Sequence, residues 1–269
     1  MALFPQAPPL PIAFLFPTSD LNPKKVNELF ADQYEALKAD HPCALYRDGK
    51  VFGVAGRVHP LVFRGHRVVY RGWMLNAAEY TAMVDAIYTM DGVPFTSLSE
   101  YLLCHQLPNW YHQISGLTMK TEFFAPDCDS EAELRRLNWP GYFIKDHVKS
   151  NKSVLGSVAH RPEDGPAIVV ELAKYRGGIE GGLCVREYCP VTDEWRVFVR
   201  EGEFNFVMGI PRDYLDLVMK VRNRIMAPFY SIDIGRDRTG KPVVVEIGDG
   251  QVSDIVGWPP DMFATIWKN

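Results

Sequence analysis

The sequence lacks the cysteine pattern of a metal-binding or disulfide-bonded domain. Among its 269 residues are five cysteines, and no two of them form a C-x-x-C pair. Structural zinc sites need closely spaced cysteine and histidine ligands, and disulfide-rich secreted domains usually contain an even number of cysteines. The dispersed, odd-numbered set predicts reduced thiols and argues against a zinc cluster.

Long apolar runs and an excess of positive charge are also missing. Prolines interrupt the apolar residues at the start of the chain, which has no early Lys or Arg, and no later stretch approaches the length of a membrane-spanning helix. The formal net charge of −4 does not favour general nucleic-acid binding, which usually requires a basic surface. We therefore expect a cytoplasmic protein without a signal peptide or membrane span, and the composition leaves a homodimer possible.

The first 115 residues contain strand-like and helix-like segments in alternation. The apolar run "PIAFLFP" predicts a buried strand, and Pro23 predicts the start of a helix after it. Asn76 is a predicted N-cap of a second helix, which follows a strand ending near Arg71. This order indicates a small α/β unit.

The remaining residues predict antiparallel strands with helices between them. Strands are expected at "YFIK", "LCVREYC" and "EWRVFVR", and a capping box of Ser130 and Glu133 predicts a helix before the first of them. A further helix is expected from Pro211, followed by a hairpin over residues 231–250, "SIDIGRDRTGKPVVVEIGDG". The second half therefore differs in architecture from the first.

The hairpin carries two carboxylates within apolar arms. A turn centred between Thr239 and Gly240 places Asp233 directly across from Glu246, with both side chains on one face. Like charges in opposed positions destabilise a sheet, whereas a cation between them reverses the sign of the interaction. The spacing therefore predicts a metal site.

Two upstream segments carry charged groups that suit phosphate. The strand "YFIK" ends in Lys145, and Glu194 and Arg196 share one face of "EWRVFVR". The loop after Lys145 adds further donors, from Lys149, Ser150, Asn151, Lys152 and Ser153. Taken alone, each segment is at least as compatible with a solvated charged surface.

The order of these parts resembles the ATP-grasp superfamily, from about Leu117 to Asp254. The segments "YRGWML" and "VEIGDGQVSD" resemble, more narrowly, its clade named for one arginine and two lysines. The resemblance implies an α/β (α+β) ATP-grasp fold, with an N-terminal α/β pre-ATP-grasp domain over residues 1–115. A central subdomain with the phosphate loop over 116–185 and a C-terminal subdomain with the metal-binding hairpin over 186–269 would enclose the nucleotide.

The resemblance also implies roles for individual residues. Lys120 and Lys145 match the two lysines of the clade, and Glu194 would bind the ribose. The implied ATP-binding residues lie on the lysine-bearing strands, the phosphate loop and the hinge; they are Lys120, Lys145, Lys152, Ser153, Glu187, Tyr188 and Glu194.

Magnesium would be held by Asp233 and Glu246, because Mg²⁺ prefers a few carboxylates together with phosphate oxygens and water. Many relatives place an Asn two residues after the glutamate, but this chain has Gly248 there, so Asp249 is the candidate third ligand. Arg196 is the preferred candidate for the arginine of the clade and would stabilise charge on the transferring phosphoryl group.

Arg71 is the other candidate for that arginine, so the catalytic set comprises Arg196, Lys145 and Arg71. Arg71 could serve the acceptor or the carboxylate substrate, or it could be a surface arginine at a strand end. Trp73 and Trp110 could line a substrate cleft, although core positions are more typical of such residues.

The resemblance implies an ATP-dependent carboxylate–amine ligase that acts through an acylphosphate and releases ADP and phosphate. Its cofactors would be ATP and Mg²⁺, and its partners small-molecule or peptide carboxylates and amines. A kinase on the same scaffold and a non-catalytic nucleotide-binding protein remain as alternatives, and the pattern does not identify the substrates.

Overall fold

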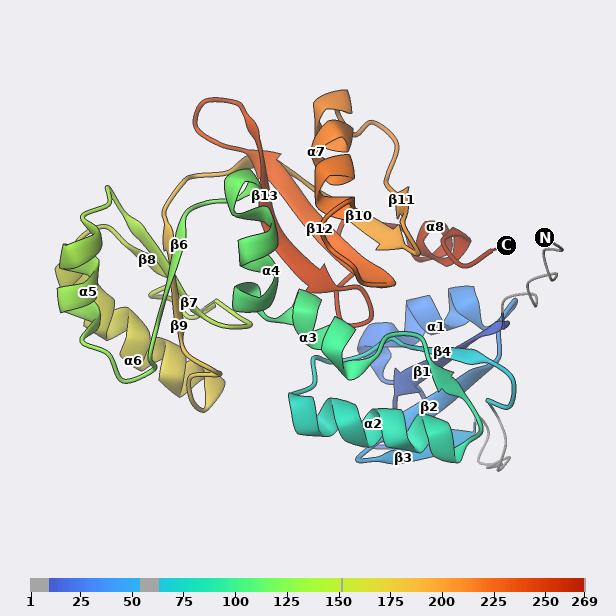
Figure 1. The fold of residues 1–269 in the computed structure, drawn as a ribbon. Helices are drawn as coiled ribbons and strands as arrows, with labels where there is room; N and C mark the ends of the chain where they lie inside the picture. Colours follow the sequence, from blue (N-terminus) through green and yellow to red (C-terminus); the bar gives the residue numbers. More distant parts are fainter. Residues whose placement is uncertain (1–9, 54–62, 151, 269) are drawn as a thin grey trace, which may run out of the picture. The chain divides into compact units, whose positions relative to one another are not determined.

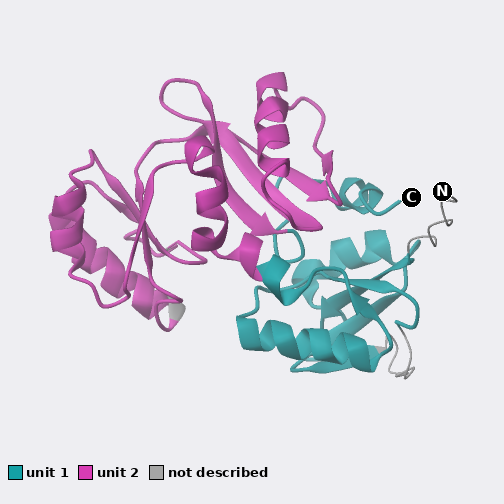
Figure 2. Cartoon of the chain, viewed as in Figure 1, with its two compact units in different colours: residues 1–101, 250–269 teal, residues 102–249 magenta. Residues whose placement is uncertain are grey.

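The computed structural model describes residues 10–53, 63–150 and 152–268. The chain divides into two compact units (Figure 2). Unit 1 comprises residues 1–101 and 250–269, and unit 2 comprises residues 102–249. No helix within the described ranges is long and apolar enough to cross a membrane.

Unit 1 is built on a five-stranded sheet with the order β3-β2-β1-β4-β5 (Figure 1). Its strands are β1 (Ile12–Pro17), β2 (Cys43–Arg47), β3 (Lys50–Gly53), β4 (Arg67–Tyr70) and β5 (Val93–Pro94). All neighbours pair in parallel except β2 and β3. A mostly parallel sheet connected through helices is the α/β architecture that the sequence predicts here.

The helices of unit 1 differ from the predictions at one boundary. Sequence reasoning starts the first helix at Pro23, but α1 spans Ala31–Leu37 and follows a 3₁₀ turn, η1 (Glu28–Phe30). An antiparallel bridge between Thr18 and Val26 holds the chain out of a helix before that point. Asn76, by contrast, caps α2 (Ala77–Thr89) as predicted, within a capping box. The remaining helices are α3 (Leu98–His105), which runs into unit 2, and α8 (Pro260–Thr265).

Unit 2 contains two four-stranded sheets, and all neighbouring strands in both are antiparallel, as predicted. The first has the order β6-β9-β7-β8. Its strands are β6 (Thr121–Phe124), β7 (Tyr142–Asp146), β8 (Val158–Ala159) and β9 (Leu183–Glu187). Helices α5 (Ser130–Leu137) and α6 (Gly165–Arg176) pack on this sheet through Leu134, Ile168 and Leu172, beside the short turn η4 (Pro162–Asp164).

The N-cap of α5 is Asp129 rather than Ser130. The Asp129 side chain accepts a hydrogen bond from Ala132 N at 3.1 Å, and Ser130 is already the first helical residue. Ser and Asp are comparable N-cap residues, so the predicted capping box is displaced by one position.

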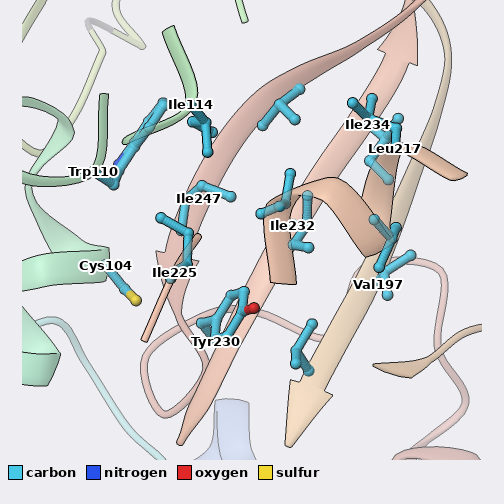
Figure 3. Close-up of a cluster of buried hydrophobic side chains, with 14 of the residues drawn as sticks. Cys104, Trp110, Ile114, Val197, Leu217, Ile225, Tyr230, Ile232, Ile234 and Ile247 are labelled. Carbon is cyan, nitrogen blue, oxygen red and sulfur yellow. The ribbon is translucent and has the colours of Figure 1, made fainter. Parts of the chain in front are cut away.

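The second sheet of unit 2 has the order β11-β10-β12-β13. Its strands are β10 (Thr192–Arg200), β11 (Glu203–Asn205), β12 (Phe229–Arg236) and β13 (Pro242–Asp249). Helices α4 (Leu107–Ile114), which is followed by the turn η3 (Ser115–Leu117), and α7 (Arg212–Arg222) cover one face. Trp110, Leu217, Ile232 and Ile247 meet in that core (Figure 3), which leaves the opposite face for charged side chains.

Candidate functional site

A cavity of about 320 Å³ lies in unit 2 between segments of its two sheets. β7 and β9 contribute one wall, and β10 and β13 contribute the other. The lining residues are Met119, Phe143, Lys145, Ser150, Arg186, Glu187, Tyr188, Cys189, Pro190, Val191, Glu194, Val245 and Glu246. Five of the predicted site residues, Lys145, Glu187, Tyr188, Glu194 and Glu246, are therefore brought together.

An ion pair between Lys145 and Glu246 joins the two sheets across this cavity. The Lys145 Nζ donates to Glu246 Oε1 at 2.6 Å, and the Lys145 side chain is only 5% exposed, against 44% for Glu246. Burial alone would raise the pKa of Glu246, but Lys145, with Arg186 and Arg196 nearby, outweighs it and holds this pKa below its usual value. The carboxylate thus stays ionised and partly accessible from the cavity.

The second hairpin carboxylate, Asp233, is paired with an arginine from β10. Arg196 donates to Asp233 through Nε at 2.7 Å and through Nη2 at 2.6 Å, which is a bidentate contact. Asp233 lies in register with Arg196 on one side and with Glu246 on the other. The predicted opposition of the two carboxylates is confirmed, and in this structure a cation from each sheet offsets their repulsion.

Glu194 lies two residues before Arg196 on β10. Partial burial, and then the negative charges of Asp233 and Glu246, raise the pKa of Glu194 above its usual value, although Arg196 opposes the shift. Several carboxylates gathered at one cavity are costly without a cation, and this accumulation of negative charge is typical of a site that binds one.

Replacing Glu194 by Gln is therefore expected to stabilise the protein slightly at neutral pH. Because the native state raises the pKa of this carboxyl, the wild type loses stability as pH rises from the ordinary glutamate pKa through the raised one. Urea midpoints of the two proteins should coincide at low pH and separate across that window. Glu203→Gln, on the exposed start of β11, is the matched control, and a Glu194→Gln variant less stable than wild type at pH 7 would contradict the argument.

Residues 136–269 match the model of an ATP-grasp domain family, the third family of the clade named for one arginine and two lysines. This segment is an ATP-grasp domain of that clade. A search of the curated proteins gave no match.

Solved structures show that the likeness in fold extends over nearly the whole ATP-grasp chain. D-cycloserine synthetase DcsG is similar with a TM-score of 0.65 and 15% identity, over 94% of this chain and 97% of that one. The D-alanine-D-alanine ligase from Coxiella burnetii has a TM-score of 0.65 and 10% identity, over 95% and 90%. ATP-grasp ligase PsnB, complexed with minimal precursor, Mg and ADP, has a TM-score of 0.59 and 11% identity, over 95% and 96%. At such identities the likeness establishes the ATP-grasp fold.

Arg186 is a residue of this ATP-grasp site that sequence reasoning missed. It is 5% exposed, and burial lowers its pKa. Its Nη1 donates to Val245 O at 2.7 Å, and its Nη2 donates to Thr118 Oγ1 at 2.6 Å. The signal was present in the strand pattern, because Arg186 pairs with Phe143 and therefore shares a sheet face with Lys145 two residues on.

A β-bulge in β13 explains how Arg186 reaches this strand. Asp233 pairs with Glu246, but the next residue, Ile234, pairs with Val244, so Val245 is an extra residue. As a result Val244 is buried in the core, while both Val245 and Glu246 line the cavity. In a regular strand two successive side chains would point to opposite faces.

The other predicted phosphate ligands lie outside the cavity lining. Lys120 is 74% exposed and its Nζ is 3.5 Å from Glu187 Oε2, at the hinge. Lys152 is exposed, Ser153 is half-buried, and Asn151 lies outside the described residues.

Arg71 and Asp249 are buried elsewhere. In unit 1, the Arg71 guanidinium donates to Gln33 Oε1 at 3.0 and 2.7 Å, to Ser253 O at 2.9 Å and to Gly250 O. The interpretation of Arg71 as a surface arginine is therefore wrong. Asp249 is fully buried and lies in register with Tyr230 at the end of β13.

The two tryptophans divide between core and surface. Trp110 belongs to the hydrophobic core of unit 2, as its residue type favours, and is 1% exposed. Trp73 is 48% exposed, and its ring lies against Phe30 with 5.1 Å between centroids.

The arrangement of Asp233 and Glu246 fits magnesium better than a metal held by protein alone. Within the described ranges, no three His, Cys, Asp or Glu side chains form a cluster that could hold a metal ion. Mg²⁺ is commonly held by one or two carboxylates and completes its shell with phosphate oxygens and water. Two opposed carboxylates beside a cavity with a buried lysine meet that requirement.

Proposed function

We propose that the chain is an ATP-dependent carboxylate–amine ligase that acts through an acylphosphate and releases ADP and phosphate. The observation that carries the proposal is the contact of Lys145 with Glu246 across a cavity walled by the hinge residues Glu187 and Tyr188. A cation for phosphate and a carboxylate for magnesium meet there at 2.6 Å. The ATP-grasp family and the ligase activities named for its structural neighbours support the same reaction class.

In this proposal the nucleotide lies along the cavity from the hinge to Lys145. The backbone at Tyr188 would bind adenine, Glu194 would accept from the ribose hydroxyls, and Lys145 would bind the phosphates. Lys120 is proposed as a second phosphate ligand, because the Glu187 carboxylate that it contacts lines the same cavity. Lys152 and Ser153 would add donors from the loop that follows β7.

Asp233 and Glu246 would hold Mg²⁺, with Asp249 as a third candidate ligand at the end of the strand. Magnesium bound there would offset the negative charge of the β- and γ-phosphates. Lys145 and Arg196 each contact one of these carboxylates, so both cations would be available to phosphate oxygens once the metal occupies the carboxylates. Arg196 would then stabilise charge on the transferring phosphoryl group.

The chemistry needs two displacements. A carboxylate oxygen of the first substrate attacks the γ-phosphorus, and the bond to the β–γ bridging oxygen breaks as ADP leaves. The amine of the second substrate then attacks the acyl carbon, phosphate leaves, and the amine nitrogen gives up a proton. The protein supplies position and positive charge, in agreement with the cations gathered around the cavity.

Cys189 offers a test of where the nucleotide binds. Its thiol is partly accessible and lines the cavity, whereas Cys184 is fully buried, and burial raises the pKa of Cys184 to about 12. Iodoacetamide at pH 8 should therefore label Cys189 and spare Cys184. ATP with magnesium should slow labelling of Cys189 and leave labelling of the half-buried Cys128 unchanged, as followed by peptide mass spectrometry. Equal rates at Cys189 with and without ATP would place the nucleotide elsewhere.

The reaction class is tested by the products formed from ATP with carboxylate and amine pools. A ligase should release ADP and phosphate only when both pools are present, and hydroxylamine should trap the acylphosphate as a hydroxamate. Release of AMP would contradict the acylphosphate route. A stable phosphorylated product without amine dependence would identify a kinase, and ATP binding without turnover would identify a non-catalytic protein.

A further inference from the structure

A second and larger cavity in unit 2 has no role in the reaction proposed above. Its volume is about 630 Å³. Four segments line it: residues 116–120, the hinge residues Glu187–Cys189, the side of α7 that carries Asp216 and Lys220, and residues 237–243 of the β12–β13 turn. Small-molecule sites commonly occupy roughly 300–1,000 Å³, so this cavity is large enough for a metabolite.

Most carboxylates around the cavity are already bound by the protein. Asp213 accepts from Arg236 Nη1 at 2.9 Å and Nη2 at 3.2 Å. Asp237 accepts two backbone N–H groups of its own turn, at 2.8 and 3.0 Å. The Glu187 carboxylate lies 3.5 Å from the Lys120 ammonium. These acids therefore have little remaining capacity for a cationic ligand.

The cations are less committed. Among the residues that the structure describes, Lys220 and Lys241 form no ion pair. Arg238 donates from Nη2 to Tyr188 O at 3.2 Å, which uses one of the five N–H groups of its guanidinium. Asp216 is the one lining carboxylate without an ion pair in the described part of the chain. Three cations thus stand against a single uncommitted carboxylate.

We propose that this cavity is a second ligand site, which binds a small polyanion through its phosphate or carboxylate groups. Lys220, Lys241 and Arg238 supply the positive charge, since ammonium and guanidinium groups bind both kinds of anion. Leu217, which is buried beneath the cavity on α7, gives it an apolar surface for the body of the ligand. Asp216 favours a ligand that also carries an amine or hydroxyl group.

The second site shares a wall with the nucleotide cavity, so the two sites are coupled. The residues that line both are Met119, Glu187, Tyr188 and Cys189. An anion near Lys120 would draw this ammonium away from Glu187 and from the ATP phosphates. The coupling, unlike the site, rests on the proposed function, and it predicts that the polyanion lowers ATP affinity, with an equal and reciprocal effect of ATP on the polyanion.

Calorimetry on the full chain tests the site separately from the proposed function. The protein is first saturated with AMPPNP, with magnesium in excess, so that the nucleotide cavity is occupied. It is then titrated with inorganic phosphate and, in a second arm, with tricarballylate, which distinguishes phosphate from carboxylate ligands. The variants are Lys220→Glu/Lys241→Glu and the control Lys174→Glu, whose lysine is exposed on α6 away from the cavity. Thermal melts establish that each variant is folded.

We expect one-to-one binding of at least one probe, about tenfold or more weaker in the Lys220/Lys241 variant, since each lost charged contact is worth roughly a factor of ten. The Lys174 control should bind as wild type does. The site is refuted if neither probe binds, if the double variant binds as tightly as wild type, or if binding occurs only without AMPPNP. Failure of AMPPNP itself to bind would instead overturn the proposed function and leave the probe result to decide the site.

Discussion

Replacing Glu246 by Gln is expected to remove the magnesium-dependent part of ATP binding and to lower turnover by about a hundredfold or more. The substitution keeps the shape of the side chain but removes the charge that would hold the metal. It also leaves Lys145, with its 5% exposed side chain, without its carboxylate partner. Calorimetry with ATP, with and without magnesium, measures the effect directly.

The control for Glu246→Gln is Glu203→Gln, because Glu203 is an exposed carboxylate in the same sheet that does not line the cavity. Magnesium should strengthen ATP binding to wild type and to this control, and should leave the Glu246→Gln variant unaffected. If magnesium changes neither affinity nor heat in the wild type, Asp233 and Glu246 are not metal ligands. If the Glu246→Gln variant responds as wild type does, another carboxylate holds the metal.

Replacing Lys145 by Ala is the second large effect, with an expected loss of ATP affinity of about tenfold or more even without magnesium. Lys145 is buried at the end of β7, and its ammonium is directed at the cavity by Glu246. An alanine there removes a phosphate ligand and leaves Glu246 near the nucleotide without its compensating charge. Unchanged binding would move the phosphate site away from β7.

A double-mutant cycle separates the two roles of Lys145. If Lys145 both binds phosphate and pairs with Glu246, the Lys145→Ala and Glu246→Gln changes should be non-additive for stability, because the two side chains are in contact. For nucleotide affinity measured without magnesium, the lysine change should dominate. Additive effects on the urea midpoint would show that the contact contributes nothing to folding. Lys174→Ala is the matched lysine control.

Much of this site followed from period-two alternation and turn position. The turn between Thr239 and Gly240 predicted the register of Asp233 with Glu246, and the structure has that register. Alternation also predicted that Trp195, Val197 and Val199 face the core, where the last two are fully buried. Such predictions succeed because a shift by one residue would bury charges and expose the apolar face.

Other features depended on contacts between distant segments. Alternation placed Arg186 on a face of β9 but could not show that this face meets β13, 59 residues away, where Val245 O accepts its proton. Arg71 is fixed by carbonyls near residue 250, 179 and 182 positions along the chain, so its local pattern as a strand-end arginine was misleading. The start of α1 was wrong because a bridge between Thr18 and Val26 prevailed over local helix signals.

The bulge at Val245 makes part of this site a matter of chain length rather than residue type. Deleting Val245 would give a regular hairpin in which Glu246 still faces Asp233 and Val244 still packs in the core. What that shorter strand would lose is the carbonyl that anchors Arg186 and one side chain of the cavity lining. A comparison restricted to substitutions would overlook this difference, and a single-residue deletion could therefore separate an intact ATP-grasp hairpin from a working nucleotide cavity.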